Sequence, residues 1–95
     1  MKKAKNFDLI KGLFTPREAL EVLTNIYSGK IQFHELKNFS SKIRLGKEDK
    51  NSKTRITELK KSLKEIQTLL NDSKVKKSKI RIESVLTVGF SDTHA

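Results

Sequence analysis

The sequence has no cysteine, a single proline and no long apolar run within its 95 residues. Lack of cysteine excludes disulfides, thiolate metal sites and cysteine nucleophiles. No stretch approaches the roughly 18 apolar residues that a membrane-spanning helix requires. The basic N-terminus resembles the start of a signal peptide, but Asp8, Lys11 and Arg17 interrupt the chain before an apolar region develops. We therefore expect a cytoplasmic protein with no membrane segment.

Apolar side chains are also scarce, at 35% of residues against 34% charged. A chain of this length buries only about 60 to 65% of the surface that its unfolded form exposes. The core must then be thin, and its elements either share faces economically or borrow a partner's surface. This favours an oligomer, and we expect a homodimer.

The formal net charge is +10, which suggests an anionic partner such as nucleic acid or a membrane surface. The excess is uneven: residues 1–14, 44–55 and 73–95 each carry three more cations than carboxylates, whereas 15–43 and 56–72 are nearly neutral. Positive charge therefore concentrates in connections and ends rather than in the segments with helical periodicity.

Residues 6–14 are short, apolar and compatible with a strand. Strict alternation places Phe7, Leu9 and Leu13 on one face, with Ile10 and Phe14 on the other. A helix over 15–45 comes next, because residues 15–18 supply an N-cap threonine, a proline at the first helical position and a glutamate at the third.

An apolar stripe keeps its phase through this long helix, at Val22, Ile26, Phe33, Leu36 and Ile43. Gly29 lies in the stripe and either breaks the helix or admits a closely packed neighbouring helix. We favour a continuous helix, because the stripe keeps its phase across the glycine. Gly46 is then a natural C-cap.

A second helix is predicted over 49–72. Its apolar residues alternate spacings of three and four, which is typical of a coiled-coil seam. Two heptads are too short to stand alone, so the seam is expected to pack against the first helix and to provide an oligomer interface. These seam residues are Ile56, Leu59, Leu63, Ile66 and Leu70.

The last predicted strand spans 79–90, with apolar side chains at even positions interrupted only by Ser84, and a disordered tail is expected over 91–95. The fold class is therefore α+β, in β-α-α-β order, within a single domain over 1–95. A long antiparallel helical hairpin returns the chain to its start, so the two strands can form an antiparallel ribbon. Such a ribbon is marginal alone, which again favours a dimer with paired hairpins and joined ribbons.

No catalytic constellation is present in the sequence. His34 has Asn38, not a ligand, at i+4, and His94 lies in the tail; we interpret His34 as a surface or partly packed helical residue. Glu18 and Glu21 lie one turn apart, a spacing common on solvated helices. The four glycines match no phosphate-binding fingerprint. We expect a protein that is not an enzyme and uses no metal or cofactor.

Two basic runs are candidate anion-binding sites, one around the hairpin turn and one before the last strand. Their alternative role is solubility together with favourable charge at helix ends. Lysines at these places would bind phosphates with little sequence selectivity. The candidate residues are Arg44, Lys47, Lys50, Lys53, Lys74, Lys76 and Lys77. A helix of about 25 residues would keep the two runs roughly 35 to 40 Å apart.

The phenylalanines do not indicate a stacking platform for nucleic acid, because most occupy positions expected to face the core. They are Phe7, Phe14, Phe33, Phe39 and Phe90.

The segments 14–19 (FTPREA), 31–41 (IQFHELKNFSS) and 46–49 (GKED) resemble a group of small bacterial proteins with no assigned function. The resemblance covers most of the chain and implies no activity. Within it, Asn38, Ser40 and Ser41 interrupt the helical face. These polar residues either cap a break, bond across a subunit interface or contact a ligand, and we favour structural or interface roles.

The leading functional hypothesis is a non-enzymatic, oligomeric interaction protein built on the hairpin. The alternative is a nucleic-acid-associated accessory factor that uses the basic runs. A third class, a regulator that binds one defined protein in the manner of an antitoxin, stays open.

Overall fold

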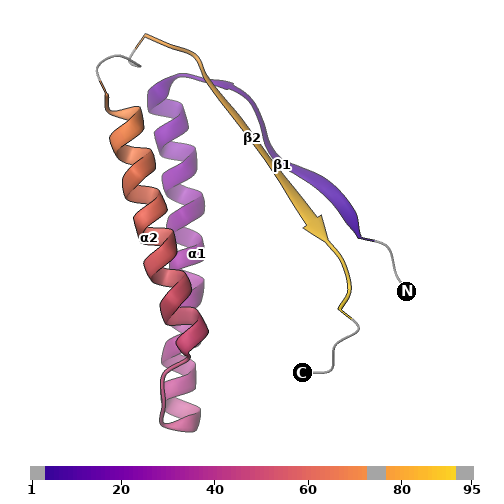
Figure 1. Ribbon diagram of the computed structural model, residues 1–95, viewed down its shortest axis with the longest axis vertical. Helices are drawn as coiled ribbons and strands as arrows, with labels where there is room; N and C mark the ends of the chain where they lie inside the picture. The colour runs from indigo at the N-terminus through magenta and orange to yellow at the C-terminus, as the bar shows by residue number, and fades with distance from the viewer. Residues whose placement is uncertain (1–3, 73–76, 92–95) are drawn as a thin grey trace.

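The computed structural model describes residues 4–72 and 77–91 and confirms the predicted α+β fold. Its elements are β1 (Lys5–Phe14), α1 (Pro16–Leu45), α2 (Lys50–Leu70) and β2 (Ile80–Val88). The helices form a hairpin and the strands form an antiparallel ribbon beside it (Figure 1). All element bounds lie within two residues of those predicted from the sequence. Most of the predicted tail, residues 92–95, lies outside the described residues.

Local capping explains where α1 begins and ends. The backbone N–H of Glu18 donates to Thr15 Oγ1 at 3.1 Å, and the N–H of Thr15 donates to Glu18 Oε1 at 2.9 Å. Because this second bond favours the charged carboxylate, the pKa of Glu18 is lowered. At the other end Gly46 adopts a φ of +69°, and its N–H donates to the Lys42 carbonyl at 3.0 Å. Both predicted caps are confirmed.

α1 runs unbroken through Gly29, as the phase of its apolar residues predicted. The suggestion that this glycine admits a closely packed helix is wrong within the chain. A Cβ built on Gly29 would meet nothing within 4 Å, so no neighbouring helix approaches it closely.

The ribbon departs from strict alternation. Phe7 pairs with Leu86, Ile10 with Ser84 and Phe14 with Ile80, and the register shifts between Asp8 and Ile10. Cross-strand partners share a face, so Phe7 lies with Ile10 and Phe14, and its predicted placement opposite them is wrong. The cause is the irregularity at Asp8–Ile10, which acts as a β-bulge and changes the phase of side chains by one residue. We call the face that carries Phe7, Ile10 and Phe14 the inner face of the ribbon.

The seam of α2 packs against α1 inside the chain. Leu59 and Leu70 are only 3% and 6% exposed, and Leu70 clusters with Ala19 of α1 and Ile82 of β2. Side chains of both helices and both strands surround this cluster: Ile10, Phe14, Leu20, Leu23, Ile66 and Ile80. The core therefore lies where the ribbon joins the hairpin.

Away from this junction the molecule is open. The ribbon diverges from the hairpin, whose turn projects beyond it (Figure 1). The radius of gyration is 16.9 Å, against about 12.4 Å for a compact chain of this length. Its extents of 49 × 35 × 14 Å describe a thin slab with room for one core layer.

Candidate interaction surface

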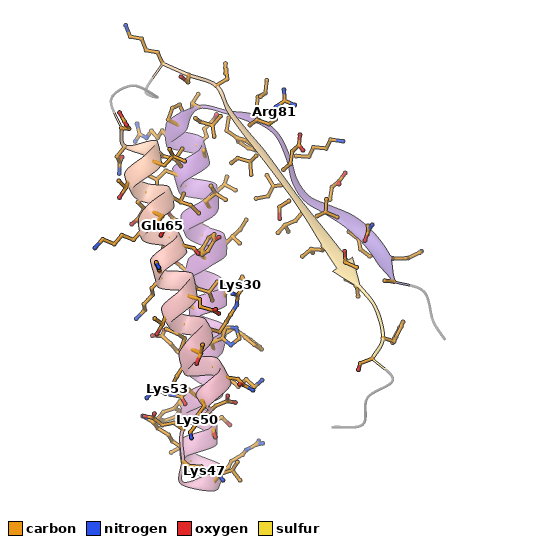
Figure 2. The ribbon with its side chains drawn as sticks, viewed as in Figure 1. Lys30, Lys47, Lys50, Lys53, Glu65 and Arg81 are labelled. Atoms are coloured by element: carbon orange, nitrogen blue, oxygen red, sulfur yellow. The ribbon has the colours of Figure 1, made fainter. Side chains whose placement is uncertain are left out.

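A cleft of about 340 Å³ separates the inner face of the ribbon from the hairpin. Its apolar lining comes from all four elements: Leu9, Ile10, Leu23, Ile26, Tyr27, Leu59, Ile82 and Leu86. Three charged side chains, Lys30, Arg55 and Glu83, also line it, and Lys30 extends from the middle of α1 (Figure 2). The lining is thus mainly apolar with a few polar groups, which is typical of surfaces that bind another molecule.

The half of α1 nearest the turn carries an extended uncovered apolar surface. Phe33, Leu36 and Phe39 are each 61% exposed and Ile43 is 70% exposed. Their spacings of three and four place these residues on one side of the helix, and we call them the α1 stripe. Phe33, Leu36 and Ile43 belong to the apolar stripe predicted from the sequence, but α2 does not cover them.

A polar line of α1 faces α2 in their place. His34 is half-buried, with Nδ1 3.5 Å from Ser52 Oγ of α2. Asn38 Oδ1 accepts the backbone N–H of Asp49 at 2.7 Å, and the hydroxyl of Ser41 donates to the Lys47 carbonyl at 2.8 Å. These bonds fasten the hairpin turn, which confirms structural roles for Asn38 and Ser41.

The spacing of His34, Asn38 and Ser41 was the overlooked signal. Four and three residues apart, they follow one helical line, and the α2 residue that meets His34 is the buried Ser52. When polar residues hydrogen-bond across a helix pair, they occupy the contact between the helices. Apolar residues on the adjacent side of the helix then remain exposed. The usual burial of apolar side chains predicts the opposite, with the apolar side of α1 facing the core.

The inner face of the ribbon is also uncovered at its free end. Phe7, Leu86 and Val88 are 50%, 45% and 54% exposed, whereas Ile82 near the junction is 9% exposed. The expectation that most phenylalanines face the core is wrong. Phe7, Phe33, Phe39 and Phe90 are at least half exposed, and Phe14 is the one packed against the core. Phe7 is exposed because the ribbon diverges from the hairpin (Figure 1), and Phe33 and Phe39 are exposed because polar residues of α1 face α2 instead. Composition alone does not reveal either arrangement.

The hairpin tip gathers part of the predicted anion-binding set. Lys47, Lys50 and Lys53 line a shallow depression there with Glu48, and all three project from the tip in Figure 2. Glu48 forms ion pairs with Lys53 and, at 3.2 Å, with Lys42. These lysines lower the pKa of Glu48, and the carboxylate in turn offsets part of the local positive charge.

Arg44 lies in the last turn of α1, next to the hairpin turn, and so belongs to the same end of the hairpin as these lysines. Lys77 precedes β2 at the opposite end of the hairpin. Lys74 and Lys76 lie outside the described residues, as does His94. Of the second run, only Lys77 lies among the described residues, and it is apart from the cations of the hairpin turn.

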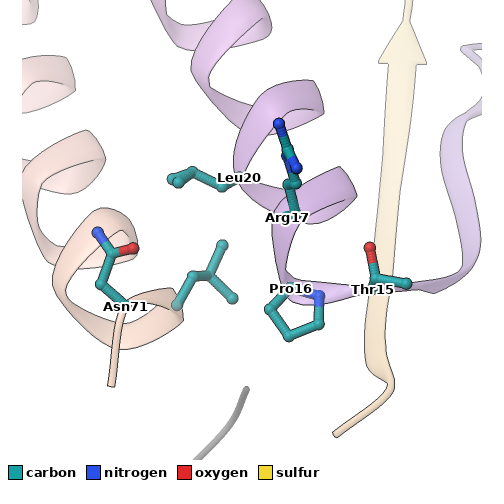
Figure 3. Close-up of a pocket in the computed structure, with 6 residues that line it drawn as sticks. Thr15, Pro16, Arg17, Leu20 and Asn71 are labelled. Atoms are coloured by element: carbon teal, nitrogen blue, oxygen red, sulfur yellow. The ribbon is translucent and has the colours of Figure 1, made fainter. Parts of the chain in front are cut away.

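A depression of about 370 Å³ lies between the start of α1 and the end of α2 (Figure 3). Thr15, Pro16, Arg17 and Leu20 line one side, and Leu70 and Asn71 the other. Few donors of the helix start face it, because Pro16 has no N–H and the N–H of Glu18 bonds Thr15. The helix start therefore offers this depression few free backbone donors, and Arg17 is the charged side chain that lines it.

The seam residues of α2 that were predicted to form an oligomer interface differ in burial within the chain. Leu59 and Leu70 are buried within the chain, while Ile56, Leu63 and Ile66 are half-buried. Their packing on α1 agrees with the first part of the prediction. Among the described residues, the large apolar side chains that remain exposed lie mainly on α1 and on the ribbon, and α2 contributes Leu69, which is 62% exposed.

Other chemistry is sparse in the described part of the chain. No group of three or more histidine, aspartate or glutamate side chains that could hold a metal ion occurs there. His34 is partly packed, which is one of the two placements that the sequence left open. Its ring lies edge-on to Phe33 at a centroid distance of 5.1 Å. No helix in residues 4–72 or 77–91 is long and apolar enough to cross a membrane.

Comparison with models of protein families, with curated proteins and with solved structures finds no match.

Proposed function

We propose that this protein is a non-enzymatic interaction protein that acts as an oligomer built on its helical hairpin. The α1 stripe is the observation that carries the proposal. Four large apolar side chains on one side of a helix are more than half exposed, while polar residues take the helix–helix contact. An exposed apolar surface of this kind is typical of a protein–protein interface.

The total accessible surface supports the same proposal. It is 8155 Å² for a mass of 10.9 kDa, whereas a compact monomer of that mass exposes about 5,600 Å². A standard interface covers about 800 Å² on each partner, and interfaces of obligate homodimers cover more. The excess is therefore large enough for association with at least one further molecule.

A pair of substitutions in the α1 stripe tests the proposal. Phe33→Ser with Leu36→Ser should leave the secondary structure unchanged, because both side chains project from the folded chain, but should weaken self-association at least tenfold, since large apolar anchors dominate interface energies. Sedimentation velocity over a concentration series measures the amounts of monomer and oligomer. Glu35→Ser with Lys37→Ser provides a matched control on the same helical turn, where no such loss is expected. Equal association of the two double variants would contradict the proposal.

The hairpin tip favours one alternative function, a nucleic-acid-associated accessory factor. Lys47, Lys50 and Lys53 project together at the end of a long hairpin (Figure 2). Lysines act on phosphates as point charges that position a protein without reading bases. Glu48 weakens this alternative, because it pairs with Lys53 at the same place.

An electrophoretic shift assay over a salt series tests the alternative. If the tip binds phosphates, Lys47→Glu with Lys50→Glu should abolish the shift for every sequence tested, because the contact carries no base information. Lys60→Glu with Lys61→Glu, on the exposed side of α2 away from the tip, is a control of equal charge change. Absence of any shift at about 50 mM salt, where counterion release favours binding most, would remove the alternative.

A further inference from the structure

Within the described residues β2 has a free edge, and Arg81 and Glu83 are the charged side chains of this strand. The sheet has the order β1–β2, so the second edge of β2 has no strand partner among the residues that the structure describes. Its nine residues contain no proline, glycine or register shift, whereas β1 has both Gly12 and the irregularity at Asp8–Ile10. Proteins normally blunt free edges with such features, because a regular free strand pairs with another strand.

The side chains on the inner face of β2 are arranged almost symmetrically about the centre of the strand. Ser84 stands at the centre, Ile82 and Leu86 lie on either side of it, and Ile80 and Val88 lie at the ends. An antiparallel pairing of two copies about Ser84 would place Ile80 opposite Val88 and Ile82 opposite Leu86, with the two serines opposite each other. β-branched and aliphatic pairs of this kind are the stabilising unit of a sheet.

We propose that β2 pairs with β2 of a second copy of this chain, antiparallel and centred on Ser84, to form a four-stranded sheet. This inference rests on the proposed function and specifies the partner and the surface. A pairing centred on Ile82 would join Arg81 to Glu83, but it would pair five of the nine strand residues, against all nine in the pairing about Ser84.

The pairing centred on Ser84 also places the covered end of one ribbon beside the exposed end of the other. A two-fold axis between antiparallel neighbouring strands is perpendicular to the sheet, so both inner faces and both hairpins lie on one side. Ile80 belongs to the junction end, where its own hairpin covers the ribbon, and Val88 belongs to the free end, where Phe7 and Leu86 are exposed. Each hairpin then lies beside the uncovered end of the other ribbon. The two-stranded ribbon, marginal alone, becomes part of a larger two-layer unit.

Single cysteines test the register directly, because the native chain contains none. Ser84→Cys should form a disulfide-linked dimer under mild oxidation, since residues directly opposite in a sheet have Cβ atoms about 4.5 to 5.5 Å apart, close to the separation in a disulfide. Val88→Cys is a matched control on the same face of the same strand. Its two copies would lie eight residues out of register, about 26 Å apart.

The expected result is at least about tenfold more linked dimer for Ser84→Cys than for Val88→Cys on a non-reducing gel. Sedimentation of the reduced proteins, run alongside, separates the strand pairing from oligomerisation in general. A reduced protein that is dimeric, with no preferential linking at position 84, overturns the β2 pairing and leaves the proposed function standing. A reduced protein that stays monomeric at tens of micromolar overturns both.

Discussion

At the scale of single residues, polar side chains in this protein determine where the apolar ones lie. His34 and Asn38 form hydrogen bonds with α2 and with the hairpin turn. Because this side of α1 faces α2, Phe33 and Leu36 are left exposed. Thr15 and Glu18 likewise satisfy donors at the start of α1. The start of α1 adjoins the core cluster through Ala19, so its cap supports the junction on which both arms of the molecule depend.

Thr15→Ala should therefore destabilise the fold by about 1 kcal/mol, because the N–H of Glu18 loses its acceptor. Urea unfolding followed by circular dichroism at a fixed protein concentration measures the loss. Thr57→Ala is a control that also removes a side-chain hydrogen bond, here to the Lys53 carbonyl. That carbonyl belongs to a helix interior, so little change is expected. Equal losses in the free energy of unfolding for the two variants would show that the N-cap contributes no more to stability than the hydrogen bond inside α2.

At the scale of elements, two glycines, one inside the long α1 and one directly after it, have opposite roles. Gly46 ends the helix in the left-handed region, at a φ of +69°, where a side chain is strained. Gly29 lies inside the helix with open space around its Cα, so a methyl group would meet no neighbour. The same residue type thus stabilises one position and weakens another.

Replacing each glycine by alanine should shift stability in opposite directions. Gly46→Ala should cost about 1 kcal/mol through its positive φ, and Gly29→Ala should add up to about 1 kcal/mol through helix propensity. Thermal unfolding of the two variants, compared with the native chain at one concentration, measures both shifts. A loss on Gly29→Ala would mean that another molecule packs against the helix at this glycine.

Helices and strands whose bounds depend on neighbouring residues could be predicted from the sequence. The way in which these elements pack against one another was less predictable. The caps at Thr15 and Gly46 depend on residues close in the chain and are confirmed. The alternation of burial predicted for β2 holds from Ile80 to Ser84 but not at Leu86 and Val88, which are exposed. The face of Phe7 depends on a register shift that only pairing with β2 determines. The exposure of the α1 stripe depends on which side of α1 meets α2, where hydrogen bonds of His34 and Asn38 decide against apolar burial.

At the scale of the whole molecule, the open shape is the central feature. A thin slab with one small core at the junction leaves the inner face of the ribbon and the α1 stripe to solvent. The net charge of +10 opposes close association of two copies. The excess of cations over carboxylates lies in residues 1–14, 44–55 and 73–95, whereas the segment 15–43 that holds the α1 stripe is nearly neutral. Burial of the α1 stripe can therefore outweigh this repulsion at moderate salt.

Association should therefore strengthen as salt screens the charge, opposite to the salt dependence of phosphate binding. This difference separates the proposed function from its alternative without any substitution.

The most direct test is the mass of the native chain in solution, measured by light scattering at tens of micromolar in about 150 mM salt. We expect a dimer, with twice the chain mass of 10.9 kDa. A mass of one chain, unchanged on raising the salt, would contradict the proposed self-association, because the α1 stripe and the free edge of β2 would then remain uncovered by a second copy.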